Sequence, residues 1–337
     1  MDLLIPLILI LPLIGIHRTD DSLKCLNKTQ TSSINGVAIV LIIIRHFFQY
    51  ISPGKYDGIM CRIDNHLGQL IVVSFLFFSG YAFVKQYQKS DKYLEKMPRK
   101  IISLYLIFVI TVMSFAVIGF VLGEKYRVVE YLLALIGMYS VGNSTWYVVA
   151  ILMLWGGSYM SYRQRIVSPF IIMFLWVGIY TAVMYLFKSD VFYNTVIAYL
   201  CGMIYCSYEM KLQPIINKYY TIIFGGATLA ILMGSFYKPN IVIYELWVVA
   251  FCIFLLLISM KVQFNNKALD LLNKYSLELY LIQRIPMIVL KGKIDNNLVY
   301  FCTCCLIMGG IAFVWKKLFL LIDRCVTKII VAKGDRV

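Results

Sequence analysis

The sequence predicts an all-α, polytopic membrane protein with about ten transmembrane helices. Of its 337 residues, 61% are hydrophobic, and the mean hydropathy is +0.79. Apolar runs of roughly 16–25 residues recur along the chain, and about 20 residues are needed for a helix to cross about 30 Å of hydrocarbon. A membrane β-barrel would show alternating segments of about ten residues, and the sequence lacks that pattern.

Ten segments carry these apolar runs, and no linker or low-complexity stretch divides them. The predicted spans are residues 32–50, 66–84, 101–122, 145–160, 166–187, 191–206, 220–237, 241–260, 275–290 and 297–321. We therefore expect one transmembrane domain over residues 32–321. An apolar segment with a linker (1–31) precedes it, and a basic cytoplasmic tail (322–337) follows it.

Two further apolar segments are too short to span a membrane comfortably. Residues 128–140 are expected to form a short re-entrant or interfacial helix, because counting them as a span would place the later basic loops outside the cell. Residues 1–16 contain Pro6 and Pro12 and lack the basic start of a signal peptide. They predict either an eleventh, short span or an interfacial anchor.

The net charge of +15 indicates membrane topology rather than binding to nucleic acid. The cations lie in short loops between apolar spans, as the positive-inside rule expects. Treating residues 85–100 as cytoplasmic places both ends of the transmembrane domain in the cytoplasm. The cations of this loop are Lys85, Lys89, Lys92, Lys96, Arg99 and Lys100.

The nine cysteines predict neither disulfides nor a metal site. Only Cys61 is expected outside the cell, so it has no evident disulfide partner. The cluster Cys302-Thr-Cys304-Cys305 falls in a predicted span and lacks other ligands for zinc. We expect no bound metal.

The pair Arg45-His46 is the feature most suggestive of chemistry, because it interrupts the apolar segment 33–50. A charged group inside the bilayer costs a few kcal/mol and needs a partner, water or a function. Apart from Lys316 and Lys317 at the cytoplasmic end of the last predicted span, only Arg45 and Arg284 among the lysines and arginines fall inside predicted spans. The alternative for His46 is a hydrogen bond between helices.

Three other polar residues have positions that bear on a site. Asn35 lies eleven residues before His46, which puts both on one face of a helix about 16 Å apart, with Asn35 near the cytoplasmic end. Glu278 and Arg284 are six residues apart and face opposite sides of a helix, so each needs another partner or an aqueous cavity. For Arg284, the alternative is that its side chain extends to the outer interface.

Five ordered motifs resemble acyltransferase family 3, a family of integral membrane acyltransferases. They cover roughly residues 32–290. Their residue sequences are similar to those of family members found among bacterial surface-polysaccharide genes. The motifs are Asn35-Gly-Val-Ala38 followed by His46, Phe75-Leu-Phe-Phe-Ser-Gly-Tyr81, Arg99-Lys-Ile-Ile-Ser-Leu-Tyr105, Ser144-Thr-Trp-Tyr147 and Tyr275-Ser-Leu-Glu-Leu-Tyr-Leu-Ile-Gln-Arg-Ile-Pro286.

The resemblance implies transfer of an acyl group, commonly acetyl from cytosolic acetyl-CoA, to a hydroxyl of a surface glycan or lipid-linked saccharide. His46 matches the family histidine proposed as catalytic, and an imidazole suits a general base, which contributes about 10²–10⁴-fold in rate. Arg45 would pair with a carboxylate, for which Glu278 is a candidate.

The resemblance also assigns binding residues. Arg99 and Lys100 would meet the phosphates of coenzyme A. Ser79 has a structural alternative, because Ser79-Gly80 also permits close approach of helices. The expected donor-binding residues are Asn35, Ser79, Tyr81, Arg99 and Lys100, and the expected acceptor-binding residues are Trp146, Gln283 and Arg284.

Three positions depart from the family pattern. Asn35 replaces a basic residue, Ser103 replaces the second cation of an Arg-x-x-Arg stretch, and Gln283 replaces a late histidine. These departures leave open a rearranged donor site or an inactive homologue. A transporter or flippase of a lipid-linked glycan is the alternative function, although no internal repeat of the kind common in transporters is found. The expected location is the bacterial cytoplasmic membrane.

Overall fold

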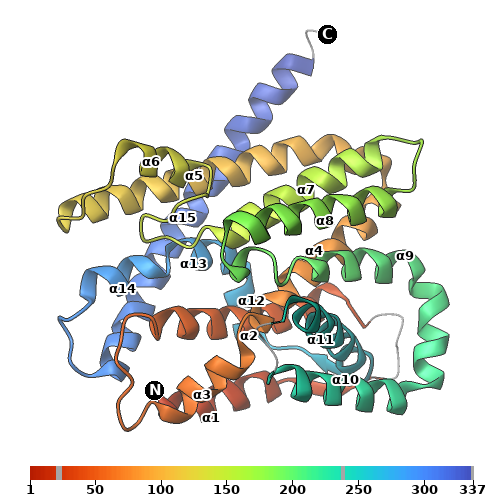
Figure 1. The fold of residues 1–337 in the computed structure, drawn as a ribbon, viewed down its shortest axis with the longest axis horizontal. Coiled ribbons are helices and arrows are strands. Elements are labelled where there is room, and N and C mark those ends of the chain that lie inside the picture. The colour runs from red at the N-terminus through yellow and green to blue at the C-terminus, as the bar shows by residue number, and fades with distance from the viewer. Residues whose placement is uncertain (20–24, 237–239, 335–337) are drawn as a thin grey trace. The chain divides into compact units, whose positions relative to one another are not determined.

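The computed structural model describes residues 1–19, 25–236 and 240–334, and the described chain is almost entirely helical (Figure 1). It forms two compact units that are interleaved in sequence. The first unit comprises Met1–Ile42, Pro53–Asp91 and Ile166–Lys274, and the second comprises Ile43–Ser52, Lys92–Arg165 and Tyr275–Val337.

The first unit contains most of the shorter elements and five long helices, of which α2 belongs to it for most of its length. Within it, α4 packs along α9, and α11 packs against α4, α9 and α10. Its elements are η1 (Asp2–Leu4), α1 (Ile5–Ile10), η2 (Leu11–Leu13), β1 (Ile16–Arg18), most of α2 (Lys28–Phe47), α3 (Gly58–Leu67), α4 (Leu70–Lys89), α8 (Pro169–Phe187), η5 (Asp190–Phe192), α9 (Ile197–Lys218), α10 (Tyr220–Gly234), α11 (Ile241–Lys261), β2 (Val262–Phe264) and α12 (Lys267–Lys274).

Two short strands and the side chain of Gln30 form a hydrogen-bonded cluster near the start of α2 and the end of α11. Strands β1 and β2 pair antiparallel, with His17 opposite Gln263. The Gln30 side chain on α2 donates to the carbonyl of Val262 and accepts from the backbone N–H of Phe264. These bonds satisfy backbone groups that a short two-stranded sheet leaves unpaired.

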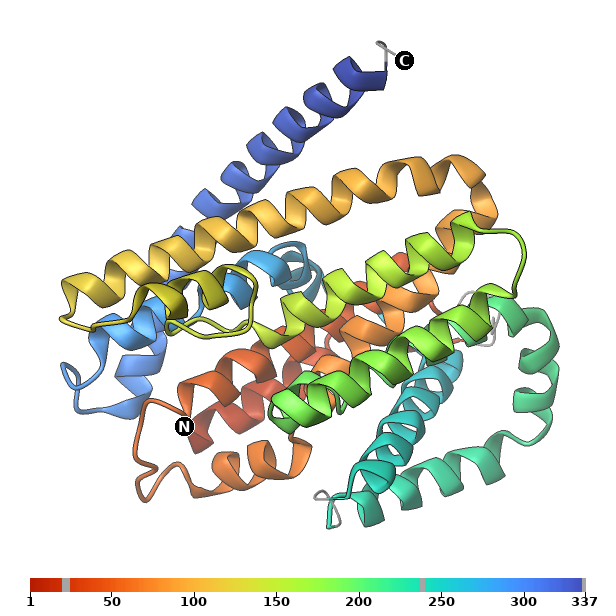
Figure 2. The same cartoon turned by 45° about the horizontal axis from the view of Figure 1, so that its top comes forward.

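The second unit is built around α15, which packs against α5, α13 and α14. Figure 2 shows α5 and α15 running close together. Its elements are the end of α2 with the turn after it, η4 (Asp91–Lys96, from Lys92 onward), α5 (Met97–Val121), α6 (Val128–Leu135), α7 (Trp146–Arg163), α13 (Ser276–Ile282), α14 (Arg284–Leu290) and α15 (Asn297–Gly334).

The predicted span 275–290 is two short helices, because Pro286 interrupts the hydrogen-bond ladder. A proline has no N–H to give to the carbonyl four residues earlier, and its ring clashes with that carbonyl. The carbonyl concerned is that of Ile282, the last residue of α13. The buried side chain of Gln283 lies at the junction and donates to the carbonyl of Tyr280 at 3.1 Å.

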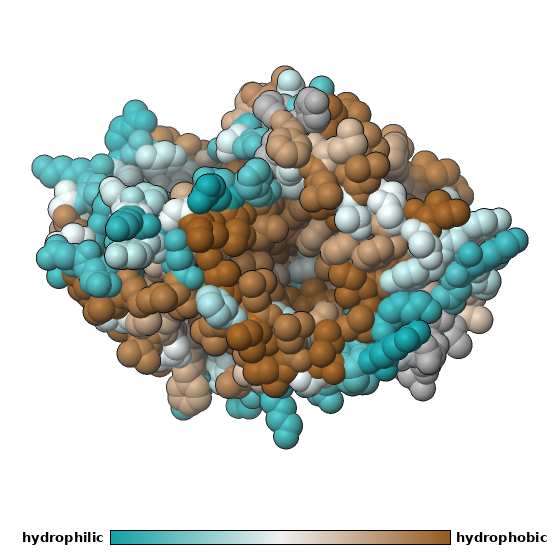
Figure 3. Space-filling view, turned by 90° about the horizontal axis from the view of Figure 1, so that it is seen from below, coloured by the Kyte–Doolittle hydropathy of each residue, from teal (hydrophilic) through white to brown (hydrophobic). Residues whose placement is uncertain are grey.

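The fold class predicted from the sequence is confirmed. Seven of the helices among the described residues are long and apolar enough to cross a membrane: α2, α4, α5, α8, α9, α11 and α15. Large apolar side chains point outward from these helices and from α10. Examples are Phe120, Ile222 and Leu306. Figure 3 shows a face dominated by apolar side chains, with hydrophilic ones at its edges. Such exposure is expected of lipid-facing helices.

The remaining predicted spans correspond to α7, to α10 and to the α13–α14 pair, so a total of ten spans stays a prediction. Residues 322–334 of the expected tail continue α15 without a break, and residues 335–337 lie outside the described residues. Residues 128–135 form the short helix α6, within the segment expected to be re-entrant or interfacial. Helices α3 and α12 and the two strands were not predicted.

Candidate active site

His46 lies in the last turn of α2, within the second unit, and its side chain is almost completely buried. Its ring centroid is 6.2 Å from that of Tyr280 on α13. The Tyr280 ring is in turn 5.2 Å from that of Tyr147 on α7. Trp146, the first residue of α7, meets Tyr147 edge-on at 6.0 Å. Helices α13 and α7 of the same unit thus place a chain of aromatic rings beside the imidazole.

The side-chain amide of Gln283 interacts with the His46 imidazole. Among the described residues, neither Nδ1 of His46 nor Oε1 of Gln283 has a hydrogen-bond partner of ordinary geometry. The Gln283 amide is held by its bond to Tyr280, so its oxygen has a fixed direction. A buried ring nitrogen without a bonded partner can accept a proton or a hydrogen bond from a bound molecule.

Glu278 is fully buried on α13, and the ion pair that the structure shows for it is with Lys316 on α15. The Lys316 Nζ lies 3.0 Å from Oε1 of Glu278. The sequence had suggested Glu278 as a partner for Arg45, which is half-buried beside His46. Lys316 escaped notice because it falls near the end of the predicted last span, where a lysine is ordinarily solvated.

Arg284 connects the start of α14 to two loops of the second unit. One guanidinium nitrogen donates to the carbonyl of Gly142 at 3.4 Å, and the other contacts the side-chain oxygen of Gln49. The guanidinium carbon also lies 5.8 Å from the centre of the Tyr50 ring. Gln49 follows His46 by three residues, so Arg284 orders the turn that leaves α2.

Arg99 and Ser103 on α5 share one partner, Asp323 on α15. Nε of Arg99 donates to Asp323 Oδ1 at 2.9 Å, its Nη2 contacts the other carboxylate oxygen, and Ser103 donates at 3.0 Å. Lys100 is exposed and lies against the ring of Tyr93, 4.5 Å from its centre. The two cations expected to bind phosphate therefore differ in their availability. Arg99 is paired with a carboxylate, whereas Lys100 contacts a tyrosine.

The other three expected donor-binding residues, Asn35, Ser79 and Tyr81, belong to the first unit. The buried side-chain oxygen of Asn35 has no partner among the described residues. Ser79 is half-buried on α4. The hydroxyl of Tyr81 donates to Glu209 of α9 at 3.2 Å, and Lys85 forms an ion pair with the same carboxylate at 2.8 Å. Tyr81 thus has a structural partner that the sequence did not reveal.

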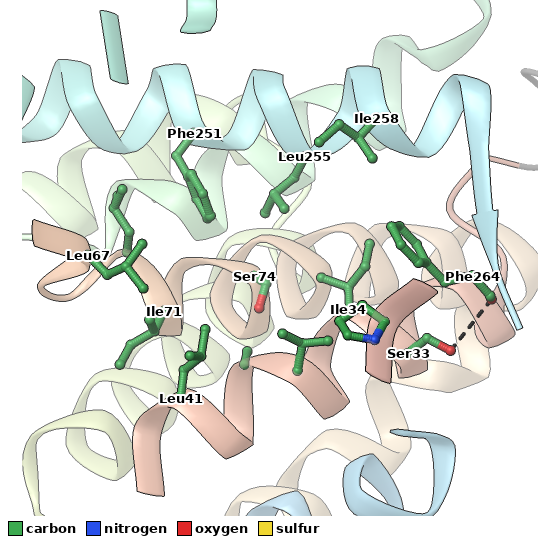
Figure 4. Close-up of a pocket in the computed structure, with 14 residues that line it drawn as sticks. Ser33, Ile34, Leu41, Leu67, Ile71, Ser74, Phe251, Leu255, Ile258 and Phe264 are labelled. Atoms are coloured by element: carbon green, nitrogen blue, oxygen red, sulfur yellow. Dashed lines mark hydrogen bonds between the residues drawn. The ribbon is translucent and has the colours of Figure 1, made fainter. Parts of the chain in front are cut away.

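An apolar cavity of about 210 Å³ lies between α2, α4 and α11 of the first unit. Its polar lining consists of Ser33, which bonds to the carbonyl of Phe264, and Ser74 (Figure 4). None of the predicted site residues lines it. The cavity is therefore not the predicted active site.

Comparison with known families decides the class of the protein. The model of the acyltransferase domain of family 3 matches residues 33–316. The chain belongs to acyltransferase family 3. Comparisons with curated proteins and with solved structures gave no match.

The match to acyltransferase family 3 begins just before Asn35 and ends at Lys316. It includes every predicted site residue together with Lys316, whereas Asp323 lies beyond it. Family membership and the apolar helices identify the protein as a multi-pass membrane acyltransferase.

Proposed function

We propose that this membrane acyltransferase moves an acyl group, most simply acetyl, from acyl-CoA to a hydroxyl of a cell-surface glycan or lipid-linked saccharide, with His46 as the general base. The observation that carries the proposal is the buried imidazole, whose Nδ1 lacks a hydrogen-bond partner among the described residues. A family of acyltransferases requires a group that takes a proton from the acceptor, and imidazole suits this task near neutral pH.

The proposed step balances without a further reactant. The acceptor oxygen attacks the thioester carbonyl while His46 takes its proton, a carbon–oxygen bond forms, and the carbon–sulfur bond breaks. The coenzyme A thiolate leaves and takes the proton back from the imidazolium. The products are the acyl ester and coenzyme A, and His46 is restored to its neutral form.

The surrounding residues suggest supporting roles. The Gln283 amide would orient the imidazole, and the rings of Tyr280 and Tyr147 would exclude water from it. Trp146 offers a flat apolar surface for a sugar ring, and Arg284 offers donors for its hydroxyls. Lys100 is the more available cation for a coenzyme A phosphate, because Arg99 is engaged by Asp323.

The test is release of coenzyme A thiol by purified protein in nanodiscs supplied with acetyl-CoA and a glycan acceptor. His46→Gln keeps the polarity and approximate size of the side chain but cannot take the proton. We expect its rate to fall by about 10²–10⁴-fold, with unchanged elution as a single folded species. His66→Gln, in the short helix α3, is the matched control and should keep the wild-type rate.

Two results would contradict the proposal in different ways. An undiminished rate in His46→Gln would disprove the role of His46 as general base, but it would leave the acyltransferase activity of the protein unchallenged. Failure of the wild type to bind any acyl-CoA would favour the transporter or the inactive homologue, and the departures at Asn35 and Ser103 would then explain the loss.

A further inference from the structure

Glu245 on α11 is a carboxylate inside a membrane-spanning helix, and it has no partner among the described residues. It belongs to the first unit, well separated in sequence from the residues proposed for catalysis. Its Oε2 is buried and has no hydrogen-bond partner among the described residues, and none of their salt bridges includes it. An acidic group in the bilayer is costly and ordinarily pairs with another group. A bound molecule can supply such a partner.

Glu245 lines an open groove of about 540 Å³ that is formed by α8, α9 and α11. The lining is otherwise apolar except for Thr181 and Tyr185, and it holds no cation. A glycine, Gly178, is part of the lining, and an added Cβ there would meet nothing within 4 Å. Glu245 is therefore the one charged residue in the lining of the groove among the described residues.

One end of the groove lies where three helix termini meet. Leu186, next to the last residue of α8, lines it together with Ile197 and Ile241, the first residues of α9 and α11. Glu245 follows Ile241 by four residues, about 6 Å along the helix. Helical side chains lean toward the N-terminus of their helix, so the carboxylate is directed toward this end, where lipid headgroups reach.

We infer that this groove binds a membrane lipid whose headgroup carries a primary ammonium, with the ammonium donating to Glu245 and one acyl chain lying along the apolar lining. A headgroup ammonium donates hydrogen bonds to the carboxylate and also favours its charged form, whereas neutral hydroxyl groups supply hydrogen bonds only. The ring of Tyr185, which is largely exposed at the same end, offers its face to the cation.

The test compares lipids retained by the purified full-length protein after reconstitution in bilayers of equal parts phosphatidylethanolamine and phosphatidylcholine. These lipids have the same net charge, but only the first has N–H donors. Native mass spectrometry should show about tenfold preferential retention of phosphatidylethanolamine, equivalent to about 1.4 kcal/mol. Glu245→Gln should reduce the preference to near parity. Glu124→Gln, which alters an exposed acid elsewhere, should preserve it.

A second variant tests the groove itself. Gly178→Leu adds a bulky side chain to the lining and leaves Glu245 unchanged, and it should lower the retention of both lipids. Equal retention of the two lipids by the wild type, or an undiminished preference in Glu245→Gln, would overturn the inference. Displacement of phosphatidylethanolamine by a neutral glycolipid would also overturn it, because hydroxyl recognition would then account for the site. None of these outcomes depends on turnover of acyl-CoA.

Discussion

At the scale of single residues, helix α15 of the second unit supplies the partners of two charged side chains on other helices. Lys316 pairs with Glu278, and Asp323 pairs with Arg99. Lys316 and Asp323 are seven residues apart, which places them on the same face of the helix two turns apart. This face thus compensates one charge from α13 and one from α5.

Removing Lys316 should be more damaging than removing its neighbour. Lys316→Met leaves the Glu278 carboxylate buried without its cation, and breaking a buried ion pair in this way costs about 3–5 kcal/mol. We expect a lower thermal unfolding midpoint in detergent, measured by thiol-reactive dye fluorescence. Lys317→Met is the matched control, because Lys317 is exposed and lies over the Phe313 ring; its midpoint should change little.

The double variant Lys316→Met with Glu278→Gln separates charge from packing. Neutralising the carboxylate removes the uncompensated charge, so much of the lost stability should return. If the double variant is as unstable as Lys316→Met, the lysine acts through its aliphatic stem rather than through the ion pair.

At the scale of elements, two glycines set the distance between α4 and α9. A Cβ on Gly80 would lie 2.0 Å from the carbonyl oxygen of Tyr199, and one on Gly202 would lie 2.0 Å from that of Phe77. Such contacts let helix backbones approach closely, which drives helix association in membranes. The Ser79-Gly80 pair therefore has the packing function considered from the sequence, whereas donor binding by Ser79 remains a proposal.

Substituting these glycines should separate the helices. Gly202→Ala should destabilise the protein by about 1–3 kcal/mol, since the added methyl group meets backbone that cannot move aside. Gly225→Ala in α10 is the control, because a Cβ there meets nothing within 4 Å, and a helical Gly→Ala change in open space is favourable by about 0.5–1 kcal/mol. Equal unfolding midpoints for the two variants would disprove the close contact.

At the scale of the whole molecule, the asymmetric distribution of lysine and arginine predicts which loops face the cytoplasm. The segment 85–100 carries the largest cluster. A fluorescent protein fused after the last residue should therefore mature and fluoresce in bacteria, whereas alkaline phosphatase at the same position should be inactive. The reverse pattern would invert the predicted orientation of every loop.

Local properties of the sequence determined the helices and drew attention to His46. The length and apolarity of a segment indicate a membrane helix without reference to its neighbours, and a histidine in such a segment is conspicuous for the same reason. Even the break at Gln283 has a local cause, the proline three residues later, although its effect was not predicted. The ordered motifs likewise predicted the acyltransferase family, which the family comparison confirmed.

Only the tertiary structure decided which polar groups meet. Arg99 and Asp323 are 224 residues apart in sequence, and their contact depends on which helices pack together and on how each is rotated. The same dependence gives Glu278 its partner Lys316, brings Gln283 to His46, and leaves Glu245 facing a groove. Sequence spacing constrains faces within one helix, but it carries no information on the rotation of one helix against another.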